Sequence, residues 1–276
     1  MGQQTTAPAG LTWGLRGRPP ADIPVGAAGA AWTSPDWAWG DSTGAGIRVC
    51  VVDSGIDGDH PLVGPVNGAY AVVAGADGPR IEEVEAQDAC GHGTACAGII
   101  RSVAPACELY SVRVLGAGFT GTGDFLIAGL RWAVSQGFDV INMSLSTTRR
   151  RFVDELHQLA DLAYFGRTVV VASAHNTPVE SFPWRFSSVI SVGSHQEPEP
   201  GLHLYNPAPP VEFFAQGQDV EVAWPGGRTT RVTGNSFATP RIAGLCALAL
   251  AKHPELTTFE LKTVLYLTAG NVHAAK

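Results

Sequence analysis

The chain has 276 residues, of which 45% are hydrophobic and only 16% are charged. This length and composition fit a globular α/β domain with a substantial core and exclude an intrinsically disordered chain. The 18 basic and 25 acidic residues give a net charge of −7, which offers no electrostatic footprint for nucleic acid or an anionic membrane. No apolar run reaches the roughly 18 residues that a transmembrane helix needs.

The cysteines and the N-terminus indicate a reducing, cytoplasmic setting. The five cysteines are odd in number and include no C-x-x-C pair, and Cys50, Cys96 and Cys246 lie in apolar runs typical of core positions. The first residues, MGQQTTAPAG, lack the basic start and apolar stretch of a signal peptide.

Strands and helices are predicted to alternate along most of the chain. Residues 1–45 are rich in Gly, Pro and Ala and are expected to form a lead-in segment whose tryptophans pack on a single domain over residues 46–276. Strands are expected at 47–52, 109–115, 140–145, 168–174 and 189–192, and helices at 92–102, 125–135, 152–164, from Ser236 onward, and 258–267. Residues 57–90 are predicted to be a loop, and 196–233 to form short strands and turns. The alternation predicts an α/β fold with a doubly wound, mostly parallel sheet and helices on both faces.

The stretch 234–240, GNSFATP, places Ser236 at the start of an apolar helix. Unpaired N–H groups and the positive end of the helix dipole favour negative charge there. The same sequence pattern would arise if Ser236 only capped the helix, because serine is a common N-cap residue.

Four polar residues from distant parts of the sequence are expected to meet at one edge of the sheet. Asp53 and Asn176 each follow a strand, while His92 and Ser236 each open a helix. Ligand sites of such sheets lie beyond the carboxyl ends of the strands. A hydroxyl, a base, a group that orients the base and an oxyanion donor are what nucleophilic acyl transfer requires. Taken singly, these residues could equally be turn formers or helix-start residues.

Three of these residues lie in recognisable blocks: DSGID from Asp53, GHGTACAG around His92 and GNSFATP around Ser236. These resemble the signature blocks of subtilisin-like serine peptidases, usually D-[ST]-G, H-G-T-x-x-A-G and G-T-S-x-A-[ST]-P, over residues of about 45 to 270. The resemblance implies Ser236 as nucleophile, His92 as general base and acid, Asp53 as its orienter and Asn176 as side-chain oxyanion donor. It also implies substrate-binding segments that would hold the peptide as an added strand. These segments are Gly121, Thr122 and Gly123; Ser144, Leu145 and Ser146; and Ser173, Ala174 and His175.

The chain also departs from the family pattern. Asn235 replaces the usual Thr before the nucleophile, and Arg241 stands where His often follows the proline. His175 replaces a usual Gly in the segment expected to line the S1 pocket, which leaves the specificity open. Only 52 residues precede Asp53, fewer than a folding prosegment and the start of such a domain would be expected to need.

The function expected from these features is a serine endopeptidase acting on peptide or protein substrates, with no cofactor and no bound metal. A dedicated processing role, such as removal of a leader from a modified peptide, would suit it. The alternatives are a peptide-binding scaffold without turnover, and acyl transfer or macrocyclisation by the same residues.

Several other polar residues are not assigned a functional role. We interpret Arg149, Arg150 and Arg151 as a solvated loop, His60 as a surface or loop residue, and Asn142 as a buried hydrogen-bonding residue.

Overall fold

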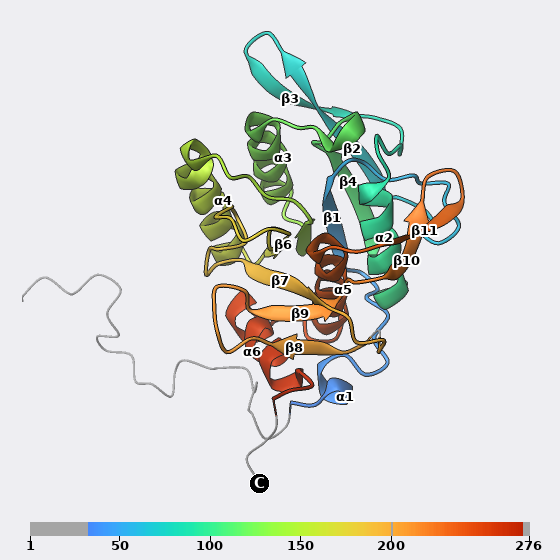
Figure 1. Cartoon of the computed structure of the whole chain (residues 1–276), viewed down its shortest axis with the longest axis vertical. Helices are drawn as coiled ribbons and strands as arrows, with labels where there is room; N and C mark the ends of the chain where they lie inside the picture. The colour runs from blue at the N-terminus through green and yellow to red at the C-terminus, as the bar shows by residue number, and fades with distance from the viewer. Residues whose placement is uncertain (1–32, 200, 273–276) are drawn as a thin grey trace, which may run out of the picture.

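A nine-stranded sheet forms the centre of the computed structural model, which describes residues 33–199 and 201–272 (Figure 1). Within these residues the strand order is β3-β2-β4-β1-β5-β6-β7-β9-β8. The strands are β1 Arg48–Asp53, β2 Gly68–Gly75, β3 Gly78–Glu83, β4 Glu108–Arg113, β5 Val140–Met143, β6 Val169–Ser173, β7 Ile190–His195, β8 His203–Tyr205 and β9 Phe213–Gln216. A separate antiparallel pair consists of β10 Val220–Trp224 and β11 Arg228–Val232.

The middle of the sheet is parallel and only its two edge strands, β3 and β8, run antiparallel to their neighbours. The predicted class of a mostly parallel sheet is therefore confirmed. The loop predicted for 57–90 is wrong in part, because β2 and β3 form a hairpin that pairs through β2 with β4. β3 is mostly exposed, so no alternation of apolar residues marked it in the sequence.

Helices cover both faces of the sheet, as predicted. The longer ones are α2 His92–Val103, α3 Gly123–Ser135, α4 Val153–Phe165, α5 Asn235–Lys252 and α6 Thr258–Thr268, and the short ones are α1 Pro35–Ala38, η2 Ala117–Phe119 and η3 Arg150–Phe152. The alternation of β1 shows the two layers: Val49 and Val51 join the core beneath α2, α5 and α6, whereas Cys50 and Val52 join the core beneath α3 and α4.

The topology places the candidate site at the carboxyl end of β1. The chain leaves β1 to build β2, β3 and β4 on one side and then crosses to β5, β6 and β7 on the other. Such a switch point opens a crevice between the strand ends. Asp53 is the last residue of β1, and Ser144 and Ala174 directly follow β5 and β6.

Of the lead-in segment predicted for 1–45, residues 1–32 lie outside the described residues. In the remainder, Trp37 stacks on His253 with ring centroids 4.1 Å apart, and Trp39 packs against the core beneath α5 and α6. The boundary at 45/46 stays a prediction. Among the described residues, no helix is long and apolar enough to cross a membrane.

Candidate active site

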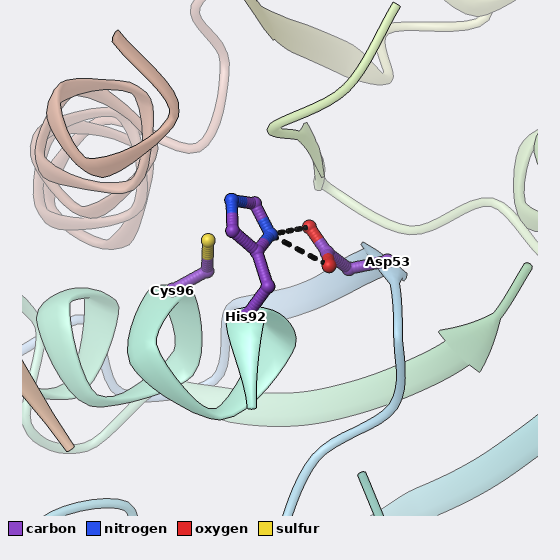
Figure 2. A group of neighbouring side chains, drawn as sticks. All are labelled: Asp53, His92 and Cys96. Carbon is purple, nitrogen blue, oxygen red and sulfur yellow. Dashed lines mark hydrogen bonds and ion pairs between the residues drawn. The ribbon is translucent and has the colours of Figure 1, made fainter. Parts of the chain in front are cut away.

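Asp53 and His92 form a buried pair where β1 ends and α2 begins (Figure 2). The His92 Nδ1 atom lies 2.8 and 2.9 Å from the two Asp53 carboxylate oxygens. A carboxylate can only accept, so Nδ1 carries the proton and the neutral ring leaves Nε2 as an acceptor. The second ring nitrogen points away from Asp53. Asp53 is fully buried and His92 is 8% exposed, so the pair is well shielded from water.

The surroundings of His92 hold its pKa above the usual value. Burial acts to lower the pKa of His92, but the charge of Asp53, its hydrogen bond and the charge of Asp88 together outweigh burial, so the pKa is raised. A raised pKa makes the neutral imidazole a stronger base toward a hydroxyl, at pH values where the ring is neutral.

Asp88 is a residue of this site that the sequence pattern did not predict. Its Oδ1 accepts hydrogen bonds from the Gly91 N–H at 2.8 Å and the Ser54 hydroxyl at 2.7 Å, while Oδ2 accepts from the Thr94 N–H at 2.8 Å. The carboxylate thus caps the N-terminus of α2 and ties it to the residue after Asp53. The sequence did contain a signal for this role: Asp88 is an acidic residue three positions before Gly91, and Gly91 directly precedes the helix predicted at 92–102.

The start of α2 requires glycine at two positions. Gly91 adopts φ 94°, a left-handed conformation that side chains disfavour. A β-carbon on Gly93 would lie only 2.0 Å from the Gly55 carbonyl oxygen. The helix therefore packs directly on the turn after Asp53, which fixes the position of His92.

Ser236 lies in the first turn of α5 and is 8% exposed. Pro240 has no N–H, so the Ser236 carbonyl lacks the helical hydrogen bond that position 240 would normally donate. The Ser144 hydroxyl donates to this carbonyl at 2.8 Å instead, and the Cys96 thiol lies 3.7 Å from it. Asn142 in turn donates to Ser144, as expected for a buried hydrogen-bonding residue. These hydrogen bonds hold the backbone of Ser236, the candidate nucleophile, in place.

The Asn176 side chain faces the same small space as Ser236. A β-carbon added to Gly234 would lie 3.3 Å from Ser236 Oγ and 3.5 Å from Asn176 Nδ2. Asn176 Oδ1 accepts the Asn235 N–H at 2.9 Å, which leaves Nδ2 available as a donor. Asn235 Oδ1 also accepts from the N–H and the hydroxyl of Ser194, both at 2.9 Å, so the segment before the nucleophile is fastened to β7.

Of the nine residues predicted to bind substrate, six line cavities and three are buried. Five of them line a cavity of about 620 Å³ beside the site: Gly121, Thr122, Gly123, Ser146 and His175. Leu145 lines an adjoining cavity of about 100 Å³ together with Leu126. The other three are buried: Ser144, Ser173 and Ala174. The Ser173 hydroxyl donates to the Ala174 carbonyl, so a substrate contact from this group would involve backbone, and that stays a prediction.

His175 lies in the wall of the larger cavity, held by the turn that follows it. Its Nδ1 accepts the Thr177 N–H at 3.1 Å, which assigns the proton of the neutral ring to Nε2.

His60, interpreted as a surface or loop residue, is only 1% exposed, and its Nε2 lies 2.7 Å from the Arg228 carbonyl oxygen. The surface interpretation is wrong because β11 covers this loop.

Within residues 33–199 and 201–272, the group of side chains close enough to share a metal ion is Asp53, His92 and Cys96, whose ligand atoms lie within 4.8 Å of one another (Figure 2). His92 Nδ1 is already bound to Asp53. Burial raises the pKa of the Cys96 thiol well above its usual value, and a neutral thiol is a poor metal ligand. The group therefore has the chemistry of an acid–base pair beside an inert thiol.

Comparison with known proteins relates both the sequence and the fold to one family. The subtilase family model matches residues 44–276. Subtilisin E of Bacillus subtilis is 33% identical over 242 residues, which cover 82% of this chain and 61% of the relative. Subtilisin of Bacillus pumilus is also 33% identical, with 82% and 85% covered. The chain thus spans less than two thirds of the length of some of these relatives, subtilisin E among them.

The fold agrees with a solved structure of the same kind. The crystal structure of a cold adapted subtilisin-like serine proteinase superposes with a TM-score of 0.65 at 26% identity, covering 81% of this chain and 82% of the other. With the family model matching most of the chain, the protein belongs to the subtilase family.

Proposed function

We propose that the protein is a serine endopeptidase whose catalytic residues are Ser236, His92 and Asp53. The observation that carries the proposal is the buried Asp53–His92 pair, with Nδ1 close to both carboxylate oxygens. The ring of Phe237, the residue after Ser236 in α5, has its centroid 5.3 Å from that of the His92 ring. Membership of the subtilase family supports the proposal.

In the proposed reaction His92 Nε2 accepts the proton of the Ser236 hydroxyl while Oγ bonds to the carbonyl carbon of the substrate. The C=O electron pair moves to oxygen, where Asn176 Nδ2 and the Ser236 N–H donate hydrogen bonds. The intermediate then collapses, the C–N bond breaks and Nε2 returns the proton to the leaving amine. Water repeats the sequence on the acyl-enzyme and releases the acid. Asp53 keeps the proton on Nδ1 throughout.

A fluorophosphonate probe, which reacts with an activated serine hydroxyl, tests the proposal directly. We expect stoichiometric labelling at Ser236, located by mass spectrometry, and none in Ser236→Ala. An unlabelled wild-type protein that still binds peptides would instead make it a non-catalytic scaffold. Cyclic or aminolysed products from peptides that carry a free amine would point to acyl transfer.

We also propose a dedicated processing role, such as leader removal, in a reducing compartment such as the cytoplasm. All five cysteines are unpaired, four of them buried, which suits a compartment where disulfides do not persist. Mass spectrometry of products from a diverse peptide library tests the role, and a narrow set of cleavage sites is expected. Broad cleavage of most peptides would contradict it.

A further inference from the structure

The cavity beside the candidate active site has a charged side that the catalytic proposal leaves unexplained. Gly121–Gly123 and Ser146 form the part predicted to hold the substrate backbone, with His175 beside them. From Ser146 the wall continues without interruption through Thr147 and Thr148 to the three arginines and Phe152. The arginines that were interpreted as a solvated loop therefore share one cavity of about 620 Å³ with the predicted substrate edges.

The wall of this cavity is entirely free of acidic side chains among the described residues that line it. Arg150 forms an ion pair with Glu180, and Arg151 lies 3.4 Å from Asp124, but neither carboxylate lines the cavity. The Arg149 guanidinium has no ion pair with any described residue. The wall is thus locally basic in a chain whose net charge is −7.

The two existing ion pairs are weak competitors for a ligand. Arg150 and Arg151 are exposed on the surface, and Asp124 is exposed too. Exposed ion pairs contribute little because water and salt screen them. A carboxylate inside the cavity could accept two parallel N–H groups from one guanidinium, which is a more directional contact.

Two helices begin at the same cavity, and the positive ends of their dipoles are partly offset by Asp124 in the first turn of α3 and by Asp154 and Glu155 in that of α4. Gly123 is the first residue of α3 and Phe152 is the N-cap of α4, and both line the wall. A β-carbon on Gly123 would overlap the Phe152 ring, so the two helix starts are in direct contact. The N-terminal ends of both helices therefore lie at a wall that includes three arginines.

We propose that this cavity is a subsite for an acidic side chain, so that the preferred substrates carry Asp or Glu close to the scissile bond. The inference rests on the proposed peptidase function, because it places the peptide between Gly121–Gly123 and Ser146. Arg149 is the main specificity-determining residue, since its guanidinium is not engaged by a protein carboxylate.

Paired peptides that differ only by Glu against Gln, at each position from four before to two after the scissile bond, test the subsite. At one position we expect kcat/KM for the Glu peptide to exceed that for the Gln peptide by about tenfold, with the excess shrinking at high salt. Arg149→Gln should reduce the ratio of kcat/KM for the Glu peptide to that for the Gln peptide, and Arg149→Glu should reverse it. Arg80→Gln, an exposed arginine in β3, is the matched control and should leave the ratio unchanged.

Binding of the same peptides to Ser236→Ala separates this inference from the proposed function. A ratio of Kd values that favours Glu in this variant supports the subsite even if the wild type proves inactive. Ratios near one at every position, in a wild-type protein that the fluorophosphonate probe labels and that cleaves the Gln peptides, would overturn the subsite and leave the peptidase function standing.

Discussion

The backbone N–H of Asn235 donates to the side-chain oxygen of Asn176 at 2.9 Å. This bond fixes which end of the Asn176 amide faces the space beside Ser236: the oxygen is engaged, and the NH₂ group is free to donate. The Asn235 side chain reinforces the arrangement, because its Nδ2 donates to the Ala174 and His175 carbonyls at 3.2 and 3.3 Å. Asn235, which stands where the family usually has Thr, is therefore a positioning residue for Asn176, the proposed oxyanion donor.

We expect Asn235→Ala to lower kcat by about tenfold to a hundredfold, since it frees the segment that carries Asn176 and small misplacements of catalytic groups are costly. Asn176→Ala should lose more, about 10²–10³-fold, which is the loss already known for the equivalent donor in subtilisin. Asn235→Thr should retain more activity than Asn235→Ala. An Asn235→Ala variant with wild-type kcat would contradict the positioning role.

Ser236→Ala and His92→Ala should each abolish peptidase activity, with a loss on the order of 10⁶ in kcat, again the size already known for subtilisin. Both side chains are proposed to act in the chemistry, so the far-UV circular dichroism of both variants should stay close to that of the wild type. The melting temperature should also stay close for Ser236→Ala, whereas His92→Ala leaves the buried Asp53 carboxylate without its partner and should melt lower. Purified variants measured with one fluorogenic peptide provide the test. Retention of more than a few per cent of activity in either variant would refute the proposed roles.

The fold class could be predicted from the sequence because it follows from short-range patterns, and the convergence of the four polar residues was inferred from the same patterns. Strand ends and helix starts identify one edge of a parallel sheet, and that edge carries Asp53, His92 and Ser236. The supporting residues were harder to find. Asp88 acts through a loop that meets the turn after β1, and Ser144 replaces the N–H that Pro240 lacks. The bond from the Ser54 hydroxyl to Asp88 and the bond from Ser144 to the Ser236 carbonyl join residues distant in sequence, so they depend on tertiary packing that no local pattern encodes.

The pH dependence of kcat/KM should show the influence of Asp88 on His92. His92 must be neutral to act as a base, and its pKa is raised above 6.5, so the acidic limb of the profile should lie above pH 6.5. Asp88→Asn removes one of the charges that raise this pKa, so the limb should move to lower pH. Asp77→Asn, in the exposed turn of the β2–β3 hairpin, is the control and should leave the limb in place. An unmoved limb in Asp88→Asn would exclude an electrostatic role for Asp88.

The same raised pKa has a consequence for stability. A histidine with a higher pKa in the folded state contributes stability that is fully present below its unfolded pKa near 6.5 and is lost as pH rises through the folded pKa. Asp88→Asn should therefore reduce stability more in acid than at alkaline pH, once the constant loss from the weakened α2 cap is subtracted. Denaturant unfolding at a series of pH values measures this difference.

His175→Gly should broaden the preference for the residue before the scissile bond. The imidazole ring occupies the wall of the cavity, so the wild type should cleave poorly after Phe and Tyr and should favour small, polar or acidic residues. Removal of the ring opens space, and cleavage after aromatic residues should rise while cleavage after Ala stays similar. A library in which Phe or Tyr dominates this position for the wild-type enzyme would show that the ring does not narrow the pocket.

We predict that stability and activity do not depend on tightly bound calcium. Many secreted members of the family carry a calcium loop inserted in the helix that begins at the catalytic histidine. Here α2 runs unbroken from His92 to Val103, β4 starts at Glu108, and no Asp or Asn lies between His92 and Glu108. Calcium prefers about six to eight oxygen ligands, usually with carboxylates among them.

Two carboxylates of the preceding loop, those of Asp57 and Asp88, already accept protein N–H groups. Asp57 Oδ2 accepts from Gly226 at 2.8 Å, and both oxygens of Asp88 cap α2. A thermal melt in EDTA and in millimolar calcium tests the prediction. Saturation to 100 times Kd would add about 2.7 kcal/mol of stability, which would raise the Tm by roughly 5–10 °C for a domain of this size. We expect the same Tm in EDTA and in calcium. A rise in Tm of that size with calcium would show that the protein has a calcium site and would contradict the prediction.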